Sequence, residues 1–272
     1  MKISIIYFSP TGNTALIADK LEETLLDLNI SISIEIKDIT IKEKRKKINF
    51  KEYDLIFFGF PVYGWVAPEL IKNWLKTIEG YNKPASIFFT YGGINSGVAI
   101  NETIQLLSEK NFNVISAAEF VTSHTFNLAG WEILPNRPND QDFKVVKDYA
   151  YKTYLKSSKS PYISLKFNSR KVPERVLKKI KGNIRGFIET PSRNGLDCSL
   201  CYKCEEECPT KAMDAKTGRA DPESCLRCLR CIKICPDQVL KISDKSKFQH
   251  IILSAEKITM EEIKNRKSLV FI

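Results

Sequence analysis

The chain has 272 residues, of which 43% are hydrophobic, and a formal net charge of +10. Its length suits a core domain with a smaller module, and it contains no apolar run long enough to span a bilayer. The apolar start, Met1–Phe8, meets a Ser-Pro-Thr-Gly turn before it reaches the length of a signal-peptide core. We therefore expect a first strand, no membrane partner and a cytoplasmic location.

Apolar runs alternate with amphipathic stretches over the first half of the chain, which predicts an α/β fold with a parallel sheet. Three of the expected strands are nearly continuous apolar runs, as in strands covered on both faces. The strands are expected at Lys2–Phe8, Ser31–Asp38, Tyr53–Phe60, Ala85–Tyr91 and Asn113–Val121. The helices are expected at Thr14–Leu28, Pro68–Ile78, Ser96–Lys110 and Asp140–Leu155.

Three loops at the carboxyl ends of the predicted strands carry residues suited to a nucleotide cofactor. The first precedes a helix, where backbone N–H groups and the helix dipole favour phosphate. The other two offer aromatic rings for stacking and glycines for close backbone approach, although each loop alone is also compatible with a surface turn. The candidate residues are Ser9, Thr11, Gly12, Asn13, Thr14, Pro61, Val62, Tyr63, Gly64, Trp65, Thr90, Tyr91, Gly92 and Gly93.

These loops resemble those of flavodoxins, and the resemblance covers residues 1–155. It implies a flavodoxin-like, doubly wound, parallel five-stranded sheet of order 2-1-3-4-5 that binds FMN where the strand order reverses. Tyr63 or Trp65 would stack on the flavin ring, and Gly64 matches the position where a peptide flips towards the reduced flavin. A nicotinamide site is disfavoured, because no GxGxxG follows the first strand and a P-loop lysine is missing.

His124 lies in the long loop Thr122–Asn139. Loops of this length are usually functional or mobile, so this one is a candidate to cover the flavin or contact a substrate. A lone loop histidine is more often inert, and we assign no catalytic residue.

Residues 157–193 form a basic linker, since residues 151–190 contain eleven Lys or Arg and only two acids. Three interpretations are open: a solvated linker, a docking face for an acidic redox protein, or a nucleic-acid surface. Nucleic acid is disfavoured, because aromatic residues are sparse there and no known binding motif appears. A short helix is expected at Pro173–Lys181.

All eight cysteines fall between positions 198 and 235, in two CxxCxxCxxxCP runs whose members are 27 residues apart. One compact block favours metal ligation in a reducing compartment over disulfides. Zinc is the alternative, but four-ligand zinc sites usually have two separated CxxC pairs. The runs resemble those of bacterial-type two-cluster ferredoxins over residues 194–241, which implies two [4Fe–4S] clusters in a small α+β ferredoxin-like domain.

In such ferredoxins the fourth cysteine of each run ligates the cluster of the other run. The first set of ligands is then Cys198, Cys201, Cys204 and Cys235. The second set is Cys208, Cys225, Cys228 and Cys231. The module departs from acidic ferredoxins, because it carries several cations, and positive charge near a cluster should raise its reduction potential. These cations are Lys203, Lys211, Lys216, Arg219, Arg227, Arg230 and Lys233.

Together the two resemblances predict a flavodoxin–ferredoxin fusion. Its parts would be an FMN domain (1–156), the basic linker (157–193), a two-cluster domain (194–241) and a C-terminal extension (242–272) without an assigned role. The predicted function is electron transfer between a redox partner protein, the clusters and FMN. The alternative is a flavin-dependent reductase of a small organic or quinone-like substrate, while a redox sensor would need an effector element that we do not find.

Overall fold

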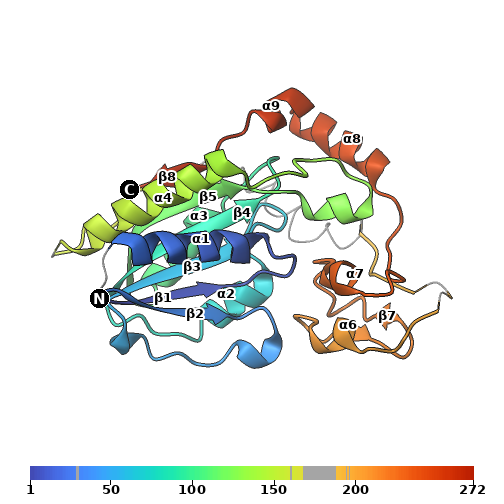
Figure 1. Cartoon of the computed structure of the whole chain (residues 1–272), viewed down its shortest axis with the longest axis horizontal. Coiled ribbons are helices and arrows are strands. Elements are labelled where there is room, and N and C mark those ends of the chain that lie inside the picture. Colours follow the sequence, from blue (N-terminus) through green and yellow to red (C-terminus); the bar gives the residue numbers. More distant parts are fainter. Residues whose placement is uncertain (29–30, 160, 168–187, 194, 196) are drawn as a thin grey trace.

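The structure is a computed structural model that describes residues 1–28, 31–159, 161–167, 188–193, 195 and 197–272. Its central sheet has the order β2-β1-β3-β4-β5-β8 (Figure 1), and its first five members are parallel. The predicted order 2-1-3-4-5 is therefore confirmed, with one further strand at the edge. The strands are β1 (Lys2–Tyr7), β2 (Ser33–Asp38), β3 (Leu55–Pro61), β4 (Lys83–Tyr91), β5 (Phe112–Val121) and β8 (Leu269–Phe271).

Helices cover both faces of the sheet, as the apolar strands require. On one face α1 (Asn13–Leu28) and α4 (Asp140–Ser157) contact each other and share a core with Phe57 and Phe88. On the other face α2 (Glu69–Leu75) and α3 (Ala99–Ser108) pack on Phe58. Since the parallel strands all end at one edge, the three predicted loops lie at that edge. None of the described helices is long and apolar enough to cross a membrane.

The cysteine-bearing module has little regular structure. It contains α6 (Lys203–Glu206), α7 (Arg230–Ile234) and a hairpin of β6 (Met213–Asp214) with β7 (Arg219–Ala220). Ser192 and Lys241 exchange two backbone hydrogen bonds of 3.0 and 3.1 Å, so the chain segments that lead into and out of the module lie side by side. The expected helix at Pro173–Lys181, and most of the basic linker, lie outside the described residues.

The segment 242–272 returns to the first domain. After α8 (Ser246–Glu256) and α9 (Met260–Lys264), β8 pairs antiparallel with β5. Buried Leu253 and Ile263 share a core with Trp131. Ser268 Oγ accepts a hydrogen bond from Val121 N at 2.9 Å and lies 2.6 Å from the buried carboxylate of Asp142. This segment is thus an integral part of the sheet domain.

Ile263→Ala tests this packing, because the Ile263 side chain is fully buried. We expect it to lower the free energy of unfolding of the sheet domain by about 2–5 kcal/mol, through lost burial and the cavity left behind. All three tryptophans lie in this domain, so tryptophan fluorescence during urea unfolding reports on it.

Ile251→Ala is the matched control, since Ile251 is 61% exposed on α8. Its effect should stay within about 0.5 kcal/mol. Equal effects of the two substitutions would contradict the described docking of the C-terminal segment.

Candidate cofactor site

The loop between β1 and α1 contains the predicted phosphate-binding residues. Ser9 Oγ accepts a hydrogen bond from Ala15 N at 3.0 Å, and Ser9 N donates to Thr40 Oγ1 at 2.9 Å. Gly12 has φ +90°, a left-handed conformation that favours glycine. The loop is therefore held in a sharp bend at the start of the helix.

Four backbone N–H groups of this loop donate to no other described residue: those of Thr11, Gly12, Asn13 and Thr14. Those of Gly12, Asn13 and Thr14 are donors that the start of α1 leaves unsatisfied, and that of Thr11 directly precedes them; such groups favour an anion. The loop thus fits a phosphate group such as that of the predicted FMN.

Two of the predicted side-chain donors connect loops to one another. Thr14 Oγ1 lies 2.8 Å from Thr90 Oγ1, and Asn13 Nδ2 donates to Ser123 O at 2.9 Å. The first predicted loop is thereby tied to the end of β4 and to the loop 122–139. The expectation of phosphate binding consequently rests on the backbone N–H groups, with Ser9 and Thr11 beside them.

The second loop makes a tight turn at the end of β3. Tyr63 N donates to Val66 O at 2.9 Å, and Gly64 and Trp65 both have positive φ, +55° and +69°. Trp65 lies against Gly97, where an added Cβ would stand 2.2 Å from Trp65 O. This turn holds the predicted stacking residues in a defined position.

The third loop is overlaid by the insertion 122–139. An added Cβ at Gly92 would stand 2.2 Å from His124 Cδ2, and one at Gly93 would stand 2.4 Å from Leu134 Cδ1. These two glycines therefore admit the close approach of this insertion. Pro61 and Val62 lie beside the same strand end, and Val62 N donates to Thr90 O at 2.9 Å.

His124 has a structural role. Its Nδ1 accepts a hydrogen bond from Phe126 N at 3.1 Å and so caps the short helix Thr125–Ala129. Its ring lies 4.4 Å, centroid to centroid, from that of Trp131. Burial of the imidazole lowers its pKa from 6.5 to about 3, so the ring is neutral near pH 7.

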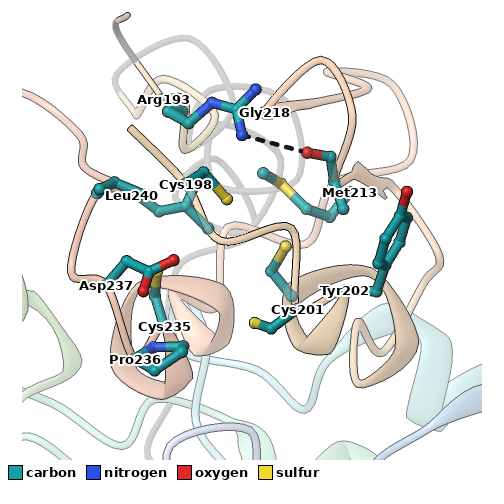
Figure 2. Close-up of a pocket in the computed structure, with 13 residues that line it drawn as sticks. Arg193, Cys198, Cys201, Tyr202, Met213, Gly218, Cys235, Pro236, Asp237 and Leu240 are labelled. Carbon is teal, nitrogen blue, oxygen red and sulfur yellow. Dashed lines mark hydrogen bonds between the residues drawn. The ribbon is translucent and has the colours of Figure 1, made fainter. Parts of the chain in front are cut away.

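The first predicted set of cysteines surrounds one cavity: Cys198, Cys201, Cys204 and Cys235 (Figure 2). Three belong to the first run and one to the second. Burial, and then the charges of the other three sulfurs, raise the pKa of Cys204 to about 11. The structure therefore brings together the four thiols that the crossed pattern predicts.

The second predicted set is grouped in one region, where Cys208 and Cys231 pack against the cluster that contains Cys225. The sulfur of Cys231 interacts electrostatically with Cys228, Cys225 and Cys208, the last of which comes from the first run. Burial is the main cause that raises the pKa of Cys231 and that of Cys228, the latter to about 12. Iron bound at either set would have to displace these thiol protons.

The duplication extends to backbone conformation. Backbone N–H groups point at sulfur, from Leu200 to Cys198 Sγ and from Arg227 to Cys225 Sγ, both at 3.4 Å. Non-glycine residues with positive φ also recur 27 positions apart: Leu200, Tyr202 and Lys211, then Arg227, Leu229 and Gln238. Such a left-handed backbone conformation costs about 1–3 kcal/mol at each residue and persists where the surrounding structure enforces it. Loops folded around sulfur in this way fit iron–sulfur clusters.

The cysteine module docks on the loops that end the strands (Figure 1). Cys228 is close enough to Tyr63 that, after burial, its charge contributes to raising the Tyr63 pKa. The Tyr63 hydroxyl is buried without a hydrogen-bond partner among the described residues. The second cysteine set therefore lies beside the predicted flavin-stacking loop.

Sequence reasoning missed the polar residues of this docking surface. Arg230 Nη1 donates to Pro10 O at 2.8 Å, and Lys233 Nζ donates to Thr11 O. Lys211 Nζ lies 3.4 Å from Glu43 Oε1, and Arg45 donates to Pro209 O. The unusual basic character of the module was the available signal, but it pointed to cluster potentials and not to the neighbouring domain.

Comparison with known proteins identifies two kinds of domain in the chain. Residues 4–126 match the family model of the flavodoxin domain, and residues 190–236 match that of the 4Fe-4S dicluster domain. A flavodoxin of Clostridium saccharobutylicum is 32% identical over 111 residues, which are 41% of this chain and 66% of that protein's length.

Solved flavodoxin structures are also similar. Flavodoxin 1 of Bacillus cereus is 20% identical with a TM-score of 0.45, over 57% of this chain and 98% of its own. A flavodoxin from the domain Archaea is 16% identical with a TM-score of 0.43, over 58% of this chain and 100% of its own.

Paired substitutions test the crossed cysteine sets. Cys204→Ala/Cys235→Ala removes two ligands of one set and should leave about four irons per chain, whereas Cys204→Ala/Cys208→Ala affects both sets and should leave almost none. Iron and sulfide analysis after anaerobic purification measures the difference. The opposite ranking would show that each run holds its own cluster.

The neutral His124 makes stability depend on pH. The unfolded histidine binds a proton below pH 6.5, whereas the folded one does so only near pH 3, so acidification favours unfolding. His124→Asn keeps an acceptor for Phe126 N but does not titrate. Between pH 7 and pH 5, the free energy of unfolding should fall less steeply for this variant than for the wild type. Below pH 6.5 the two slopes should differ by about 1 kcal/mol per pH unit. Parallel curves in tryptophan-monitored urea unfolding would refute this.

Proposed function

The chain joins a flavodoxin domain to a 4Fe-4S dicluster domain, as a flavodoxin–ferredoxin fusion does, and we propose from this that it passes electrons between an external redox partner and an internal chain of cofactors. The flavodoxin domain implies FMN, and the dicluster domain with its eight cysteines supports two [4Fe–4S] clusters. FMN exchanges electrons singly or in pairs, whereas a cluster exchanges one at a time.

We assign the phosphate of FMN to the backbone N–H groups of Thr11–Thr14, with Ser9 and Thr11 beside it. Tyr63 and Trp65 are assigned to the ring, together with the backbone of Thr90–Gly93 on the side away from His124 and Leu134. Each cluster takes one of the two cysteine sets, so that its four thiolates come from both runs. This exchange of ligands ties together a module with few buried apolar side chains.

The observation that carries the proposal is the nearness of the second cysteine set to the Tyr63 loop: Leu226 and Tyr63 pack against the same core, and the charge of Cys228 acts on the Tyr63 hydroxyl. It makes the second set, which includes buried Cys225 and Cys228, the inner cluster site beside the flavin. The first set is the outer one, since Cys201 is exposed and the adjacent Leu200 side chain is 44% exposed. A partner protein would then meet the outer cluster, and the inner cluster would lie between it and FMN.

A carrier is favoured over a reductase of small substrates. A reductase needs a pocket over the flavin, and the insertion 122–139 was the candidate for its wall. Instead, His124 and Leu134 of this insertion pack on Gly92 and Gly93, and Trp131 packs against the C-terminal segment. The insertion is thus engaged in packing.

The partner is proposed to be a redox protein of acidic surface. The basic linker supplies the complementary charge, and complementary charge mainly speeds and orients a transient encounter. Such an encounter suits a carrier that must bind and release its partner in each cycle.

Reduction kinetics test the route. A reduced small bacterial ferredoxin should reduce the bound FMN of the wild type rapidly. In Cys208→Ala/Cys231→Ala, which lacks the inner cluster, the rate per bound flavin should fall by about tenfold or more, because the direct path is longer. Anaerobic stopped-flow absorbance measures both rates.

A small reducing dye is the control, since it reaches the flavin without the clusters and should reduce both proteins at similar rates. Equal rates with the ferredoxin donor would rule out the clusters as the route.

A further inference from the structure

Two cations of the cysteine module lie on the outer side of the phosphate-binding loop. Arg230 Nη1 donates to Pro10 O at 2.8 Å, and Lys233 Nζ donates to Thr11 O. The Lys233 ammonium also lies 3.5 Å from the point where a Cβ on Gly12 would stand. Both side chains belong to α7, which also contains Cys231.

These contacts orient the peptide groups whose N–H donors are free. In a trans peptide the C=O and the following N–H point in opposite directions within one plane. The carbonyl of Pro10 shares its plane with Thr11 N–H, and that of Thr11 shares its plane with Gly12 N–H. Holding the two carbonyls outward therefore turns the two N–H groups inward, where an anion would be bound.

The charge of the donors adds to this effect. A hydrogen bond from a cation to a carbonyl polarises the peptide and makes its N–H a stronger donor. Two positive charges beside the loop also favour a phosphate dianion in it. Neither effect extends to the neutral part of a flavin.

The position of α7 depends on the second cysteine set. The helix lies between Cys228 and Cys235 in the chain and contains Cys231, so ligation of iron fixes its backbone. Arg230 is further held by Glu207, through Nε to the backbone oxygen at 3.1 Å and through Nη2 to the carboxylate. Glu207 directly precedes Cys208 of the same set.

We propose that Arg230 and Lys233 are positioning residues for the phosphate-binding loop, through which cluster assembly and binding of the FMN phosphate strengthen each other. This rests on the proposed flavin site and extends it, because one domain completes the site of the other. By thermodynamic linkage, the factor by which bound clusters raise the affinity for FMN equals the factor by which bound FMN raises the affinity for the clusters.

The test compares FMN with riboflavin, which lacks the phosphate. Dissociation constants are measured by flavin fluorescence quenching on the full-length, cluster-loaded protein. Lys233→Met should weaken FMN about tenfold or more and leave riboflavin almost unchanged. Lys233→Arg can still donate to Thr11 O and should restore most of the preference for FMN. Cys208→Ala/Cys231→Ala should lose the same preference.

Lys211→Met is the matched control, because Lys211 also reaches the sheet domain but contacts Glu43 and not the loop. It should change neither constant. A second experiment measures the reverse effect, by following the rate at which a chelator removes iron from the protein. Bound FMN should slow this loss of iron, and riboflavin should not.

Parallel weakening of FMN and riboflavin by Lys233→Met would reduce its role to general domain contact and overturn this inference, as would an unchanged FMN affinity. In both cases the flavin site itself would stand. A wild-type protein that binds neither flavin would overturn the inference together with the proposed function.

Discussion

The docking of α7 against the loop that follows β1 joins the cysteine module to the sheet domain. A doubly wound parallel sheet gathers its strand-end loops at one edge, and that edge is where a cofactor binds in this fold. Here the same edge also receives the cysteine module, through Arg230 and Lys233 and through Leu226, which packs against the same core as Tyr63. The docking therefore brings the second cysteine set to the loops that we propose for the FMN phosphate and ring.

The two cysteine sets have different surroundings, so the module has one enclosed site and one site near solvent. The second set is enclosed between the module and the sheet domain, whereas the first set is near solvent at Cys201. Enclosure lowers the local dielectric and strengthens the interactions of any charge placed there. Under the proposed route, the outer site would exchange electrons with other proteins and the inner site within the chain.

Much of this was predictable from sequence because it depends on local pattern. Unbroken apolar runs such as Leu55–Pro61 predict buried parallel strands. The cysteine runs resemble those of two-cluster ferredoxins, and that resemblance implies the crossed sets that the structure brings together. The role of 242–272 was not predictable, since the three-residue strand β8 is recognisable only by its pairing with β5. His124 could not be assigned for a similar reason, because its cap and ring contacts appear only when the insertion is folded. Contacts of Arg230 and Lys233 join residues more than 200 positions apart, so the basic composition of the module is visible in the sequence but the groups that these cations reach are not.

The return of β8 to the sheet domain has a consequence for biogenesis. A ribosome releases all eight cysteines before it reaches β8, so the edge of the sheet stays open while the module is still without metal. An unpaired sheet edge is a template for unwanted association. The edge of β5 is therefore closed only when Leu269–Phe271, near the end of the chain, has been made and pairs with it.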